Sequence, residues 1–241
     1  MKNNIILIIM SRLSNVLIIF LFLIGIYILY FLYFKRNQLY LGRGITINKI
    51  NSQVRQSIPP SSIANPIIGN SFTMSFWIYI KDFYYNSDCN CWKHILHKGS
   101  IIEPNETLKL TKWNEVINQL PEQCIGIWMK PNKNDIRIAM NVKSHLRPNI
   151  EYIDIENIPI RELVNFTFCI NNNFIEIYMN GKLTLTKNLS NTIEINKKDI
   201  FFNYQNTYSG FMYNFYYLPK KISSKDIKIL YSKKPKLPKK K

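Results

Sequence analysis

The stretch of sequence that decides the fold reads Phe72-Thr73-Met74-Ser75-Phe76-Trp77-Ile78-Tyr79-Ile80. In an extended chain successive side chains point to opposite sides, so every second residue shares a face. One face then consists of apolar side chains only, those of Phe72, Met74, Phe76 and Ile78. Water disfavours such a face, which therefore packs against a second layer. The stretch predicts a β-strand with one buried face.

Similar strand-like segments recur along the chain, separated by turns. They are Gly44 to Lys49, Ile125 to Met129, Ile136 to Val142, Asn165 to Ile170, Phe174 to Met179, Lys182 to Thr186 and Phe211 to Leu218. Between two of them, Asn180-Gly181 is a strong signal for a two-residue hairpin. Many short strands at this spacing predict an all-β fold, a two-sheet antiparallel β-sandwich or jelly roll.

The last of these segments is unusually aromatic. Strict alternation places four rings on one face, those of Phe211, Tyr213, Phe215 and Tyr217. Polar loops flank this segment and also Phe72 to Ile80, so neither can cover its apolar face locally. We therefore expect the closing segment to pack beside the opening one, which also removes an exposed sheet edge.

Two segments favour helices. Leu110 to Leu120 lies in an insertion between strands. A second helix is expected from Ser223, because Ser223 and Asp226 have the spacing of a capping box and an apolar face follows at Ile227 and Leu230. The prolines and serines of residues 57–66 indicate irregular structure there.

The N-terminal region contains an uncharged run from Leu13 to Phe34. A helix of about 20 apolar residues crosses the hydrocarbon core of a bilayer. The run is long for a signal peptide and no small-x-small cleavage site follows it, so it predicts an uncleaved signal-anchor helix. The expected organisation is a short segment 1–12, an anchor 13–34, a linker and first strand 35–69, a sandwich 45–232 and a basic tail 233–241.

The chain is strongly basic, with a net charge of +17, and lysines crowd its C-terminal tail. Such a tail is either solvated and disordered or attracted to anionic lipid or nucleic acid. The sequence shows no zinc-finger spacing, ribonucleoprotein motif or basic helix that would support nucleic-acid binding.

Four stretches in order resemble the laminin-G-like, concanavalin A-like family of lectin and glucanase jelly rolls. They are Phe72 to Ile80 followed by Trp92 to Gly99, Gly126 to Pro131 leading into Ile136 to Met140, Asn157 to Lys182 with its Tyr178-Met179-Asn180-Gly181 hairpin, and Gly210 to Tyr231. One departure is Glu162-Leu163, where family members usually have a Trp. The resemblance implies a jelly roll over residues 45 to 232. The single anchor and the Ile- and Asn-rich composition look similar to membrane proteins of large DNA viruses.

The family includes laminarinase-type glucanases with a Glu-x-Asp-x-Glu site on one strand. Here the candidate carboxylates are Glu151, Asp154 and Glu156. Glu151 and Asp154 are three residues apart and so face opposite sides of a regular strand, which leaves the set incomplete. We therefore predict no catalytic residues and no enzyme activity.

Cysteine and histidine cluster at Cys89, Cys91, His94 and His97. The residue types suit zinc, but the spacing matches no known finger, and a strand from His94 would send the two histidines to opposite faces. We expect no metal site. In an oxidising compartment Cys89 or Cys91 is a candidate to pair with Cys124, while a buried thiol is expected of the remaining cysteine, Cys169.

No cofactor is assigned. Members of the family often bind calcium through Asp side chains. The candidates here are the loop residues Asp82, Asp88 and Asp135, which form no cluster in the sequence, so calcium binding is neither claimed nor excluded. Sugars stack on exposed rings, which makes Trp92, Trp113, Tyr84 and Tyr85 candidates for glycan stacking, although buried packing is the commoner role of such rings.

Together these features favour a non-catalytic, membrane-anchored recognition or structural module in a virion membrane or a host-derived internal membrane. Its expected partners are the lipid bilayer and a capsid or other virion protein. A glycan-binding attachment protein is the alternative, and a glycoside hydrolase is the third interpretation.

Residues 13 to 34 should remain in the mature chain as a bilayer-spanning helix, because nothing in the sequence directs cleavage. Carbonate extraction of membranes containing the protein should leave it in the pellet at full length. Release of a shortened, soluble product would contradict the prediction.

Overall fold

The computed structural model describes residues 15–32, 45–82, 90–101, 110–144 and 149–237. The chain divides into two compact units, Met1–Arg43 and Gly44–Lys241. In the first unit lies a helix, Asn15–Leu32, and among the described residues it alone is long and apolar enough to cross a membrane. A signal sequence near an N-terminus also satisfies this criterion of length and apolar composition.

The second unit consists of two six-stranded antiparallel sheets. Sheet A has the order β1 (Ile45–Asn51), β12 (Ser209–Leu218), β3 (Ser71–Asp82), β8 (Leu163–Asn171), β9 (Phe174–Met179) and β10 (Lys182–Asn188). Sheet B has the order β2 (Gln56–Ile58), β11 (Ile200–Phe202), β4 (Lys93–Gly99), β5 (Gln123–Met129), β6 (Ile136–Val142) and β7 (Asn149–Ile155). The predicted all-β, two-sheet antiparallel sandwich is confirmed.

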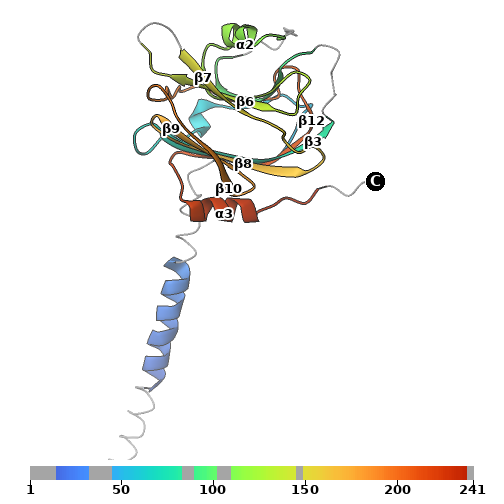
Figure 1. Ribbon diagram of the computed structural model, residues 1–241. Coiled ribbons are helices and arrows are strands. Elements are labelled where there is room, and N and C mark those ends of the chain that lie inside the picture. The colour runs from blue at the N-terminus through green and yellow to red at the C-terminus, as the bar shows by residue number, and fades with distance from the viewer. Residues whose placement is uncertain (1–14, 33–44, 83–89, 102–109, 145–148, 238–241) are drawn as a thin grey trace, which may run out of the picture. The chain divides into compact units, whose positions relative to one another are not determined.

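The sheets form two layers, and each has a helix on its outer side (Figure 1). Helix α2 (Trp113–Gln119) packs on sheet B, where Val116 and Leu120 join a cluster with Trp128 of β5. Helix α3 (Ser224–Ser232) packs on sheet A, where the ring of Tyr231 stacks on Trp77 of β3. A short 3₁₀ turn, η1 (Pro60–Ser62), follows β2.

The main core lies between the two sheets. Phe72, Met74, Phe76 and Ile78 of β3 all contribute to it, as their alternation predicts. From sheet B the same core receives side chains that include Ile127, Ile138 and Met140. Each of these seven side chains is at most 2% exposed, so burial of their apolar area is the main stabilising term of the domain.

The closing segment packs beside the opening one, as predicted. Strand β12 forms antiparallel ladders on both sides, with β1 and with β3. Its residue Tyr213 is in register with Lys49 on one side and Trp77 on the other. The last and first strands of the domain thus complete the same sheet.

The expected single aromatic face of β12 is not formed. Phe215 and Tyr217 lie in the core, whereas Phe211 and Tyr213 lie outside the core cluster, where Lys49 sits over both rings. The cause is a register shift between Tyr213 and Tyr216, with Asn214 at a positive φ of 47°. An extra residue in a strand exchanges the faces of all residues beyond it.

Three short elements depart from the sequence prediction. Strand β2 and turn η1 occur in the proline-rich stretch, for which the sequence predicts irregular structure, and no sequence pattern predicts β11. Strands of three residues carry too little periodicity to be recognised. Here β11 pairs with both β2 and β4, so these strands depend on tertiary neighbours. Helix α2 begins at Trp113, later than expected, and α3 begins after Ser223 with the expected Ser223–Asp226 capping box.

A chain that ends at residue 209 should lose cooperative folding, because it lacks β12 and so leaves β3 and β1 without their common neighbour. A chain that ends after Ser232 keeps every described strand and should melt within a few degrees of the whole protein. Circular dichroism melts of the two truncated chains test this. A cooperative melt of the chain ending at 209, at the temperature of the whole protein, would contradict it.

Candidate binding site at one end of sheet B

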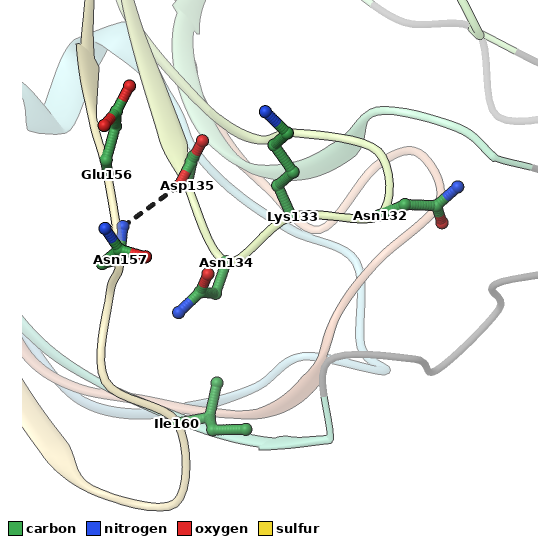
Figure 2. Close-up of a pocket in the computed structure, with 7 residues that line it drawn as sticks. All are labelled: Asn132, Lys133, Asn134, Asp135, Glu156, Asn157 and Ile160. Carbon is green, nitrogen blue, oxygen red and sulfur yellow. Dashed lines mark hydrogen bonds between the residues drawn. The ribbon is translucent and has the colours of Figure 1, made fainter.

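An open pocket of about 460 Å³ lies at one end of sheet B, where β5 turns into β6 and where β7 ends. Figure 2 shows the residues that line it. They are Asn132, Lys133, Asn134, Asp135, Glu156, Asn157 and Ile160. Six of the seven are polar or charged, and Ile160 supplies an apolar surface that is 42% exposed.

Backbone turns built by asparagine shape this pocket. Asn132 and Asn157 have positive φ angles of 52° and 57°, a conformation that asparagine tolerates better than most residues. The backbone N–H of Ile158 donates to the carbonyl of Asn134 at 2.7 Å, and the Asn134 side chain donates to the Ile158 carbonyl at 3.1 Å. The two loops are therefore held to each other, and the pocket has a defined shape.

Asp135 is the buried carboxylate of the pocket, at 6% exposure. Its Oδ1 accepts from the backbone N–H of Asn157 at 3.0 Å, the contact drawn in Figure 2. Lys130 lies 3.8 Å from its Oδ2. The side chains of Lys133 and Glu156, by contrast, are exposed and carry opposite charges. The pocket thus combines a fixed acceptor with a free cation and a free anion.

Lys130 links the pocket to an ionic network on the outer face of sheet B. Its Nζ lies 2.8 Å from Asp154 Oδ2. Arg137 donates to both oxygens of Asp154, at 2.7 and 2.8 Å. Partial burial by itself would raise the pKa of Asp154, but the hydrogen bonds and charges of Arg137 and Lys130 outweigh it and lower that pKa. Asp154 therefore stays ionised and bound at neutral pH.

Aromatic rings surround the Arg137 guanidinium. Its central carbon lies 3.8 Å from the ring centre of Tyr152, 4.9 Å from Trp113 and 5.0 Å from Trp92. Trp92 is only 6% exposed and Trp113 is partly buried against it, so these two candidate stacking residues pack around Arg137 and α2. The exposed ring of this group is Tyr152, at 44%. Tyr84 and Tyr85 lie outside the described residues.

Tyr152 and Arg137 were not among the sequence candidates. A signal for Tyr152 was present, because it alternates with Ile153 and Ile155, which point into the core. No sequence pattern predicts the role of Arg137, because its partners Asp154 and Trp92 come from other segments of the chain.

The three carboxylates are not brought together. Glu151 accepts from the backbone N–H of Ser190 at 2.7 Å and from its hydroxyl at 2.5 Å. Asp154 is held on the outer face by Arg137, and Glu156 lies past the end of β7 in the pocket. Each carboxylate therefore has a different environment, and no acid–nucleophile pair forms.

His94 and His97 do not face opposite sides, contrary to the expectation from a regular strand. Their rings contact each other, with His94 Nε2 and His97 Nδ1 2.8 Å apart. Register shifts between His94 and Leu96 and between His97 and Gly99 break the alternation of β4. Among the described residues no group of three or more potential metal ligands occurs.

The histidine pair forms a directed hydrogen-bond chain. His94 Nδ1 accepts from the backbone N–H of Tyr204 at 3.0 Å, which leaves the proton on its Nε2 to be donated to His97. His97 Nε2 then donates to the carbonyl of Ser100 at 2.7 Å. Burial lowers the pKa of His97 to about 4. Burial, together with the neighbouring His97 ring, also places the pKa of His94 well below its usual value. Both rings are neutral at pH 7.

The cysteines follow the sequence expectation in part. Cys91 is disulfide-bonded, and Cys89 lies outside the described residues. Cys124 is a free, buried thiol, so the pairing considered for it is not formed. Cys169 is also free and buried in β8. Burial raises the pKa of Cys124 to about 12 and of Cys169 to about 11, so both thiols stay protonated.

Of the three loop aspartates, Asp135 lies in the pocket and Asp82 is the last residue of β3. Asp88 lies outside the described residues. Asp135 already binds a backbone N–H and lies near Lys130, and calcium remains unassigned.

The same sandwich occurs in the binding domains of botulinum neurotoxins. The serotype D domain in complex with N-acetylneuraminic acid is 16% identical, with a TM-score of 0.53 over 77% of this chain and 42% of that chain. The DC domain in complex with rat synaptotagmin II is 18% identical, with a TM-score of 0.52 over 78% of this chain and 45% of that one. The DC domain in complex with SialylT is 17% identical, with a TM-score of 0.51 over 78% and 44%.

At these identities the likeness is one of fold, and this chain spans less than half the length of each of those domains. No protein-family model matches the chain, and no curated protein matches it.

Stability should fall as the pH drops from about 6.5 to about 4, because an unfolded histidine takes up a proton in this range while the buried His97 does not. Above pH 7 this contribution is fully present, and below pH 4 it is lost. For His97 alone the loss amounts to about 3 kcal/mol. Urea unfolding of the wild type and of His97→Asn, at pH 7.5 to 4.5, measures it. The variant should be less stable than the wild type at pH 7.5, but its free energy of unfolding should fall less between pH 7.5 and 4.5. An equal fall in both proteins would contradict the low pKa of His97.

Proposed function

We propose that this chain is a non-catalytic recognition module, held at a membrane by its N-terminal helix, and that the pocket at the end of sheet B binds a glycan. The observation that carries the proposal is the pocket itself, with its fixed acceptor and its exposed amide and charged side chains. The proposed location is a virion membrane or a host-derived internal membrane, which rests on the apolar helix and the composition of the chain.

The chemistry of the pocket suits a ligand rich in hydroxyl groups. A sugar hydroxyl both donates and accepts, so its binding site needs both kinds of partner. Asparagine amides provide both, Asp135 and Glu156 accept, and Lys133 donates. Ile160 offers an apolar contact for the C–H face of a sugar ring, and Tyr152 is an exposed aromatic ring on the same sheet.

The structural neighbours suggest which glycans to try first. The serotype D binding domain is described in complex with N-acetylneuraminic acid and the DC domain in complex with SialylT. Lys133 is an exposed cation in the pocket, and a cation is the natural partner of the carboxylate of a sialic acid. We therefore propose a sialylated glycan as the ligand class.

A protein partner is a second candidate, supported by a different neighbour. The DC binding domain is described in complex with the protein rat synaptotagmin II. A capsid or other virion protein would be the corresponding partner here. A hydrolase finds no support in the geometry, because the carboxylates Glu151, Asp154 and Glu156 lie apart and two of them are engaged by other groups.

The full-length protein should bind sialyllactose, and Lys133→Gln should weaken this binding about tenfold or more, because a hydrogen bond to a charged group contributes roughly 1.5–3 kcal/mol. Lys143→Gln, which removes another exposed lysine just past the other end of β6, should change the affinity by less than about twofold. Isothermal titration calorimetry measures both.

Glu156→Gln distinguishes the ligand class. A sialylated ligand should bind this variant as well as the wild type or better, since a negative charge is removed from the pocket. Weaker binding to Glu156→Gln with no effect of Lys133→Gln would indicate a neutral sugar. Absence of glycan binding, or binding that neither variant alters, would contradict the proposal, as would hydrolysis of laminarin by the wild type that Asp154→Asn abolishes.

A further inference from the structure

The outer face of sheet A presents aromatic rings covered by lysines, a surface that the glycan pocket does not use. We call it the basic aromatic face, and it consists of Trp77, Phe211, Tyr213, Tyr216, Tyr231, Lys49, Lys233 and Lys234. Lys49 lies 4.5 Å above the ring centre of Phe211, Lys233 lies 5.6 Å from that of Tyr216, and Lys234 lies 5.9 Å from that of Trp77.

Contacts within the fold hold these lysines in place. The bulge at Asn214 turns Phe211 and Tyr213 outward, and Tyr213 is in register with Trp77. Tyr231 of α3 stacks on Trp77 with 5.3 Å between ring centres. The Asn214 side chain then donates to the carbonyl of Lys233 at 2.8 Å. The same bulge that turns Phe211 and Tyr213 to the outer face therefore also holds the start of the basic tail across them.

The charge of this region is one-sided. From Lys220 to the C-terminus the sequence has ten lysines and a single carboxylate, Asp226. On α3 itself the exposed residues include Lys225, Lys228 and Ile229. Across the part of the chain that the structure describes, Lys49, Lys225, Lys228, Lys233 and Lys234 form no ion pair with a carboxylate. Their positive charge is thus available to an anionic partner.

The length of the connecting chain sets the greatest distance between the sandwich and a membrane that holds the N-terminal helix. Twelve residues join Leu32 to Ile45, and a fully extended chain of that length reaches about 40 Å. Ile45 of β1 pairs with Tyr217 of β12, three residues before Lys220. The sandwich therefore begins beside the point at which the lysine-rich segment starts.

We propose that the basic aromatic face, together with the outward side of α3, docks on the anionic headgroups of the membrane in which the chain is anchored. Lysines near an anionic bilayer gain free energy by charge attraction, and the apolar stems of lysines favour the headgroup region. Nucleic acid is the other polyanion to consider, but single strands need exposed rings for base stacking. Here Trp77 is 1% and Tyr213 6% exposed, so these two rings offer no face for base stacking.

Docking in this way would leave the glycan pocket free. The pocket belongs to sheet B, and the basic aromatic face lies on the outer side of sheet A, with the core between them. Figure 1 shows α3 and α2 on opposite outer sides of the sandwich. The inference assumes the anchored state of the proposed function but not its ligand, so either can fail alone.

Reconstitution of the full-length protein in lipid nanodiscs tests the proposal. One set contains phosphatidylcholine alone, and the other contains about 30% phosphatidylserine, which supplies the anionic surface potential. Acetylation rates of individual lysines are read by mass spectrometry. Lys49, Lys225 and Lys228 should be protected in the anionic discs only, and half-molar salt should remove the protection. Lys143 should acetylate equally in both.

A pair of matched variants isolates the face. Lys233→Gln/Lys234→Gln should lower the ratio of docked to undocked protein on the order of 30-fold, which abolishes the protection of Lys49, Lys225 and Lys228. Lys143→Gln/Lys197→Gln removes the same charge from exposed positions outside this face and should leave the protection unchanged.

Several results would overturn the inference. One is equal acetylation in the two lipids, and another is protection that salt or Lys233→Gln/Lys234→Gln does not relieve. A third is that the same lysines are protected by a random oligonucleotide in phosphatidylcholine discs but not by phosphatidylserine. Failure of the protein to co-purify with the discs would instead reject the membrane anchor of the proposed function.

Discussion

The pairing of β12 between β1 and β3 is the constraint on which the rest of the domain depends. It is a contact between the two ends of the domain, and its ladders run from Ile45↔Tyr217 to Ser209↔Asp82. With β12 in place, β3 becomes an interior strand whose apolar face opposes sheet B. Because β12 leads directly to α3, the same pairing delivers the C-terminal helix to the outer side of sheet A.

The bulge at Asn214 divides the aromatic residues of β12 between two environments. Phe215 and Tyr217 enter the core, where Phe215 packs against Phe202 of sheet B and Tyr217 against Phe72. Phe211 and Tyr213 remain outside with Lys49. One inserted residue thus lets a single strand serve both the core and a charged outer surface, which a regular strand of the same composition could not do.

At its pocket end sheet B carries balanced charges. There the carboxylates of Asp135 and Asp154 form ion pairs with Lys130 and Arg137. Among the described residues that line the pocket, Lys133 and Glu156 are the charged side chains outside this network. A site whose ions are already paired suits the binding of a neutral or singly charged polar ligand better than that of a polyanion. The two layers therefore present surfaces of different chemistry: paired and polar groups on sheet B, and on sheet A a basic aromatic face whose lysines form no ion pair among the described residues.

The sequence by itself determined the long strands, the hairpin at Asn180-Gly181, the apolar N-terminal helix and the capping of α3 at Ser223, because each rests on local periodicity or local hydrogen bonding. Only the tertiary structure decided which residues meet. The bulges in β4 place His94 in contact with His97, and the bulge in β12 places Phe211 and Phe215 on opposite faces. The alternation of residue types along these strands does not reveal where a bulge occurs. The pocket is formed by two loops about 20 residues apart in the sequence. Arg137 contacts Trp92, Trp113 and Asp154, which come from three other segments. No local sequence pattern predicts these contacts.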